Sequence, residues 1–166
     1  VAAPALFDAV AAEAPRQMAG FKAQELASTA WAYARAGVPA PALFAAVGAE
    51  LPRKVASCTS QNLANTAWAF AKAGVEAPEL FEVVAGAALA RMPAFNAQDL
   101  ANTVWAFSTA RIAAPTVFEA VAAAAVGKMA TFKPQEPANT AWAVAAASGP
   151  AGSPAAPEAP FEAPPG

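Results

Sequence analysis

Basic side chains recur at one position of a 37-residue period and could follow a phosphate backbone. A row of positive charge with such regular spacing can neutralise successive phosphates of RNA. The same cations near helix C-termini would instead offset the helix dipole, at about 0.3 to 1 kcal/mol each, and we favour this interpretation. The candidate basic ridge comprises Arg16, Arg53, Lys54, Arg91 and Lys128.

Amides recur with the same period and could either read base edges or bond to one another between repeats. The constant amides are Gln24, Gln61, Gln98 and Gln135, with Asn65, Asn102 and Asn139 at a second position. Repeat proteins that read RNA vary the reading residue between repeats, so this constancy favours structural ladders. The variable positions, where any code would lie, are Lys22/Thr59/Asn96/Lys133 and Glu25/Asn62/Asp99/Glu136.

Catalytic chemistry has little support in the residue types. The chain has no histidine and one cysteine, Cys58, which excludes Ser-His-Asp catalysis, His/Cys metal sites and a disulfide within the chain. Cys58 stands where the other repeats carry Phe21, Phe95 and Phe132, which predicts a buried apolar residue. We therefore expect a non-enzymatic protein with no catalytic residues, no metal and no cofactor.

The charge balance and the hydropathy argue against a strong nucleic-acid binder and against a membrane-spanning protein. The chain has 10 Lys and Arg against 12 Asp and Glu, and two of the acids, Glu158 and Glu162, lie near its end. Strong nucleic-acid binders usually carry a basic excess, which is absent here. Alanine accounts for much of the 57% hydrophobic content, and no uncharged apolar run reaches the roughly 18 residues of a membrane span.

The period itself predicts the fold. Trp31, Trp68, Trp105 and Trp142 are spaced by 37 residues, as are Pro4, Pro41, Pro78 and Pro115. Such a period indicates an all-α solenoid of stacked helix pairs, an αα-superhelix with about four repeats. We predict repeat copies near 3–20, 21–57, 58–94, 95–131 and 132–148, forming one domain over 1–148. An extended Pro/Ala/Gly-rich tail follows over 149–166.

Each repeat should contain two helices. The first covers about 21–38, 58–75, 95–112 and 132–149, with Thr59 and Asn96 as N-caps and Gly37 and Gly74 as left-handed ends. The second begins at the periodic proline. One indole per repeat should fill the space between layers.

A polar strip runs along the first helices, opposite their apolar residues, because residues at i, i+3, i+7 and i+10 share a face. We predict it as the surface that contacts a protein or RNA partner. Its members are Glu25, Ser28, Arg35, Asn62, Asn65, Lys72, Asp99, Asn102, Glu136 and Asn139.

The pattern Phe-x-x-Gln-x-Leu-Ala-Asn-x-x-Trp-Ala-x-Ala, followed by Pro-x-x-Phe and then Leu51-Pro52-Arg53, resembles the octotricopeptide repeats of algal organelles. It is similar also to the 37-residue heptatricopeptide repeats, and the likeness extends from Ala3 to about Ser148. The resemblance implies an αα-superhelix, residence in a chloroplast or mitochondrion, and RNA binding along the concave side.

From these features we expect a docking or scaffold subunit of a large organellar assembly, such as a photosynthetic complex or an organellar ribosome. Its partners would be protein subunits, with membranes reached only through them. The alternative is an octotricopeptide-like protein that binds organellar RNA during processing, stabilisation or translation. The first residue is valine, which we interpret as a processed product or a fragment without its targeting peptide. Phe161 is the predicted anchor of the tail on a partner.

Overall fold

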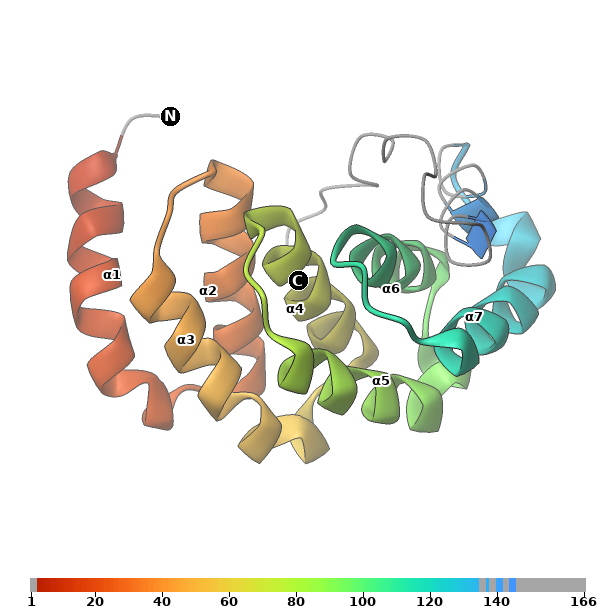
Figure 1. The fold of residues 1–166 in the computed structure, drawn as a ribbon, viewed down its shortest axis with the longest axis horizontal. Helices are drawn as coiled ribbons and strands as arrows, with labels where there is room; N and C mark the ends of the chain where they lie inside the picture. Colours follow the sequence, from red (N-terminus) through yellow and green to blue (C-terminus); the bar gives the residue numbers. More distant parts are fainter. Residues whose placement is uncertain (1–2, 135–136, 138–139, 142–143, 146–166) are drawn as a thin grey trace.

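The structure is a computed structural model that describes residues 3–134, 137, 140–141 and 144–145. Paired α-helices follow one another along an arc, which confirms the predicted all-α repeat array (Figure 1). The first helices of the pairs are α2 (Ala23–Ala36), α4 (Ser60–Ala73) and α6 (Ala97–Thr109). The second helices are α1 (Pro4–Gln17), α3 (Pro41–Glu50), α5 (Pro78–Arg91) and α7 (Pro115–Lys128). The described residues from 137 to 145 are also helical.

The periodic prolines start the second helices, as their spacing predicts. Each proline is the first helical residue, where the missing N–H costs nothing, and the preceding alanine has a non-helical backbone. A short 3₁₀ turn follows each of these helices: η1 (Met18–Gly20), η2 (Pro52–Ser57), η3 (Met92–Ala94) and η4 (Met129–Thr131). Pro52 opens η2, whereas Pro15 lies within α1, which continues to Gln17.

The first helices begin and end as their caps predict. Thr59 and Asn96 accept hydrogen bonds from backbone N–H groups of the first turn. Gly37 and Gly74 end α2 and α4 in the left-handed conformation, at φ of 66° and 67°. In the third repeat the same position is Arg111, which adopts φ of 56° although it has a side chain.

The two rows of helices pack differently. The first helices contact each other far more extensively than the second helices do, so α2, α4 and α6 occupy the shorter, inner side of the arc. Small residues allow this approach, since Ala64, Ala67 and Ala71 of α4 are all buried. The inner surface of the array is therefore built from first helices alone.

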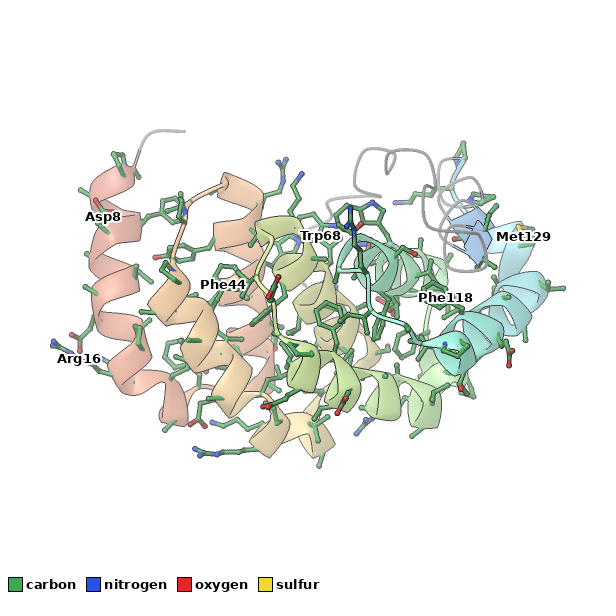
Figure 2. The ribbon with its side chains drawn as sticks, viewed as in Figure 1. Asp8, Arg16, Phe44, Trp68, Phe118 and Met129 are labelled. Carbon is green, nitrogen blue, oxygen red and sulfur yellow. The ribbon has the colours of Figure 1, made fainter. Side chains whose placement is uncertain are left out.

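Aromatic pairs join each second helix to the first helix of the following repeat. Phe44 and Phe70 meet edge to face at 5.1 Å between ring centroids, and Phe81 and Phe107 repeat this contact at 5.0 Å. Phe7 and Tyr33 do the same at 5.0 Å. Phe44 and Phe118 point into the core from the outer row, while Trp68 belongs to the inner row (Figure 2). The second-helix phenylalanines therefore face the neighbouring helices.

Three predictions concern residues outside the described part of the chain: the extended tail over 149–166, its anchor Phe161, and the strip residues Glu136 and Asn139. Within the described part, no helix combines the length and the apolar character that a membrane span needs.

Candidate functional site

Three cations of the predicted basic ridge hold successive repeats together. The Nζ of Lys54 donates to the carbonyl oxygens of Ala19 and Phe21, at 2.6 and 2.5 Å, in the turn of the preceding repeat. Lys128, two repeats later, makes the same pair of bonds to Pro93 and Phe95.

Arg91 repeats the arrangement in the repeat between them. Its Nη2 donates at 3.2 Å to the carbonyl oxygens of both Val55 and Ala56. Each cation therefore binds carbonyl oxygens in or next to the 3₁₀ turn of the preceding repeat. We call these three contacts the carbonyl clamps. The clamps support a structural role for these ridge cations, and the carbonyl groups that they bind belong to the neighbouring repeat.

The other two ridge residues make exposed ion pairs within their own repeats. Arg16 lies 3.5 Å from Glu13, and Arg53 lies 2.8 Å from Glu50. Arg16 and Arg53 have 79% and 73% of their side chains exposed, so these pairs contribute little to stability. Of the five ridge cations, only these two remain on the surface outside the clamps.

The variable acidic and amide residues at the start of the strip are members of capping boxes. Asn62 accepts from the Thr59 N–H, and the Thr59 hydroxyl accepts from the Asn62 N–H, both at 3.1 Å. Glu25 accepts from the Lys22 N–H at 2.7 Å. The two variable positions therefore vary together because each pair closes one helix N-terminus, which explains the variation without a base-reading code.

The strip lies partly between repeats. Asn62, Asn65, Asp99 and Asn102 are each less than 7% exposed. Asp99 lies beside the Ser60 hydroxyl of the preceding first helix, and this side of α6 therefore faces α4. In α2, by contrast, Glu25 is exposed and Ser28 half-buried. The predicted contact strip is thus internal at these four residues of the second and third repeats, exposed at Lys72, and more open in the first repeat.

Burial raises the pKa of the Asp99 carboxyl. Hydrogen bonds from the Asn96 backbone and the Ser60 side chain, and the charge of Lys128, act in the opposite direction without cancelling the effect. Burial also raises the pKa of the Cys58 thiol. Cys58 is therefore a buried thiol rather than a reactive thiolate, in line with its prediction as a core residue.

Indole rings form a continuous row along the inner helices. Trp31 and Trp68 are 6.3 Å apart between centroids, and Trp68 and Trp105 repeat this distance with nearly the same tilt, at 33° and 32°. Trp68 is 1% and Trp105 4% exposed. The prediction that tryptophans fill the space between layers is confirmed for these two residues.

Polar atoms without partners lie beside this row. Among the described residues, Asn65 Nδ2, Trp68 Nε1 and Asn102 Oδ1 are buried and make no hydrogen bond. Asn65 and Trp68 are three residues apart and share one face of α4. We define the inner polar row as Asn65, Trp68 and Asn102. The sequence predicts the indole only as a core residue, although the Asn-x-x-Trp spacing already places the Asn amide and the indole N–H on one face of the helix.

Cations flank the inner polar row. Arg35 and Lys72 occupy equivalent repeat positions near the ends of α2 and α4, and both are exposed. Residues four apart share a helix face, so Lys72 continues the face that carries Trp68. In the third repeat this position is Thr109. Among the described residues, no group of three His, Cys, Asp or Glu side chains could hold a metal ion.

Comparison with known proteins identifies the family. The family model described as RNA-editing substrate-binding complex 6 protein matches residues 5–148, which is most of the chain and includes every described helix apart from the first helical residue. No curated protein matches the sequence. The match agrees with the coarser content of the predicted resemblance, namely a helical-repeat family. The chain belongs to the family of RNA-editing substrate-binding complex 6 proteins.

Proposed function

We propose that this protein is a non-catalytic helical-repeat subunit of an RNA-editing substrate-binding assembly, and that the inner side of its arc contacts single-stranded RNA. The family description supports the assembly and its RNA substrate. The observation that carries RNA contact by this chain is the exposed Lys72 of α4, which lies one helical turn beyond Trp68 on the inner row of helices. We also propose the mitochondrion as its organelle.

The inner polar row lies beneath this surface. Asn65 and Asn102 are 2% and 3% exposed, because successive first helices pack over them. A single-stranded RNA on the inner side of the arc would therefore meet the exposed residues near the ends of these helices, such as Lys72.

The charges predict moderate affinity. Three of the five ridge cations are engaged in carbonyl clamps, and Arg16 and Arg53 pair with acids of their own repeats. The exposed Lys72 of α4 is the cation that we propose to meet a phosphate. A protein with few phosphate contacts should show a shallow salt dependence, since the slope is about 0.7 per phosphate for single strands. Moderate RNA affinity is compatible with a scaffold function, because a repeat array without a large net charge can bind RNA on one surface and protein subunits on another.

Fluorescence anisotropy with a labelled single-stranded RNA, at about 50 and about 200 mM salt, tests the proposal. Lys72→Ala should weaken binding and reduce the salt slope. Lys72→Glu, which places a negative charge at the same exposed position, should weaken binding further. Arg16→Ala is the matched control, because Arg16 is an exposed cation on the outer row.

The outcomes separate the two functions. Selective loss in the two Lys72 variants, with Arg16→Ala unchanged, supports RNA contact on the inner side of the arc. No binding at the lower salt concentration, or equal loss in all three variants, contradicts it and favours the protein-docking scaffold. Circular dichroism of each variant confirms that the helices remain folded.

A further inference from the structure

The end of the array at α1 and α2 carries two adjoining hollows along one side of α2. One, of about 570 Å³, is lined by Phe21, Gln24, Glu25, Ser28 and Thr29. The other, of about 290 Å³, continues along Ser28, Thr29, Ala32 and Tyr33 and reaches Leu6, Phe7 and Val10 of α1. We call this surface the terminal groove. Its lining residues follow α2 for most of the length of that helix.

The later repeats show what normally covers this surface. The α4 and α6 residues at the positions of Ser28, Thr29 and Ala32 are all buried, at Asn65, Thr66, Ala69, Asn102, Thr103 and Ala106. They are buried where α4 packs against α2 and α6 packs against α4. The terminal groove is therefore the same repeat-to-repeat surface, left open on α2.

Helix α1, the outer helix at this end, also exposes apolar side chains whose counterparts in later repeats are buried. Leu6 is 63% exposed, whereas Leu43 and Leu80 at its repeat position are 0% and 3% exposed. Val10 is 36% exposed, whereas its counterpart Val47 is 0% exposed. Exposed apolar side chains that are buried in each later copy mark a surface built for contact.

We propose that the terminal groove binds one occupant, the first helix of a further 37-residue repeat stacked against α1 and α2. The groove continues an interface that the array already uses twice, between α2 and α4 and between α4 and α6. The required chemistry follows from those copies. The occupant presents small residues to Ala32, as Ala64 and Ala71 of α4 are small, and places an indole about 6.3 Å from Trp31.

A hydroxyl group completes the match. The Ser60 hydroxyl of α4 donates to the Ala94 carbonyl oxygen at 3.2 Å, in the turn before α6, and lies near Asp99, the capping residue of α6. Glu25 is the corresponding capping residue of α2 and is exposed. A helix with the α4 sequence would therefore bring its own serine to Glu25. This makes residues 58–75 a suitable probe for the groove.

The probe is best supplied as a fusion. A copy of residues 58–75 placed ahead of Ala2, so that the copied Val75 replaces Val1, keeps the 37-residue period. We expect the fusion to raise the thermal midpoint by roughly 5 °C or more, since each 1 kcal/mol corresponds to about 2 to 4 °C at this size. The control fusion carries Ala64→Glu and Ala71→Glu in the copied helix and should give no gain.

A second pair of variants keeps the test independent of the fusion's own folding. Ala32→Glu in the chain alone should leave the thermal midpoint nearly unchanged, because Ala32 borders the open groove, whereas Ala69→Glu at the buried equivalent should lower it strongly. In the fusion, Ala32→Glu should abolish the gain in stability.

Stabilisation that both glutamate controls remove supports the proposal. Equal midpoints for the fusion and the chain alone overturn it. Concentration-dependent dimerisation of the unmodified chain that Ala32→Glu prevents, measured by sedimentation velocity, also overturns it, because a second copy would then occupy the groove.

Discussion

Asn96 and Asp99 bond reciprocally at the start of α6: the Asn96 side chain accepts from the Asp99 N–H at 2.8 Å, and the Asp99 carboxylate accepts from the Asn96 N–H at 3.2 Å. In the preceding repeat the same box uses Asn62, which has no charge. Both side chains satisfy the same backbone donors, but only Asp99 places a carboxylate in a buried position.

Asp99→Asn should therefore raise stability at about pH 7. Burial raises the pKa of Asp99, so the folded state keeps the proton to a higher pH than the unfolded state does. Stability from that proton is fully present below the unfolded pKa, near 3.9, and is lost as the pH rises through the folded pKa. The variant should have the higher thermal midpoint near neutrality, and this advantage should shrink on acidification. A variant that melts at a lower temperature near pH 7 would show that the charge stabilises the cap.

Trp68→Ala should destabilise the array by about 3 to 5 kcal/mol, because removing a buried indole leaves a cavity. Trp68 is 1% exposed and contacts Trp31 on one side and Trp105 on the other. Urea unfolding followed by circular dichroism measures the loss. Trp31→Ala is the matched control and should cost less, since Trp31 is only half-buried. Equal costs for the two variants would contradict the role of Trp68 as the centre of the row.

Lys54→Met should remove one carbonyl clamp while keeping an unbranched side chain. Hydrogen bonds to charged groups contribute about 1.5 to 3 kcal/mol each, so we expect a loss of about 1 to 3 kcal/mol in the free energy of unfolding. Arg53→Met, at the adjacent exposed cation, should stay within about 1 kcal/mol of the parent protein. Similar losses from the two variants would mean that the clamp adds nothing to a surface charge.

Gly74→Ala and Arg111→Gly should have opposite effects. Both positions are left-handed, at φ of 67° and 56°, and a side chain there costs about 1 to 2 kcal/mol. The first change should lower the free energy of unfolding by about 1 kcal/mol, and the second should raise it by a similar amount. Chemical denaturation of both variants checks the signs. Loss of stability in Arg111→Gly would indicate that the arginine side chain contributes more than its backbone strain removes.

Much of the fold could be predicted because the repeat signals are local. The proline at the start of each second helix and the caps Thr59 and Asn96 act within a few residues of their own position. The candidate site depends on side-chain contacts between repeats. The period shows which positions are equivalent, but it does not show which of them face the neighbouring repeat. From the sequence, Lys54 and Asn62 look like surface residues. In the structure, Lys54 binds a carbonyl group in the turn of the neighbouring repeat, and Asn62 caps the N-terminus of α4 within the interface between repeats.

The carbonyl clamps also determine when each turn becomes stabilised during translation. The carbonyl oxygen of Ala19 receives its bond from Lys54, which is 35 residues further along the chain. Chains emerge from the ribosome N-terminus first and more slowly than helices form. Each turn must therefore wait for the next repeat to be translated before its carbonyls are bound. A nascent array therefore gains stability one repeat at a time. The turn made most recently has no clamp until the lysine or arginine of the next repeat has been synthesised.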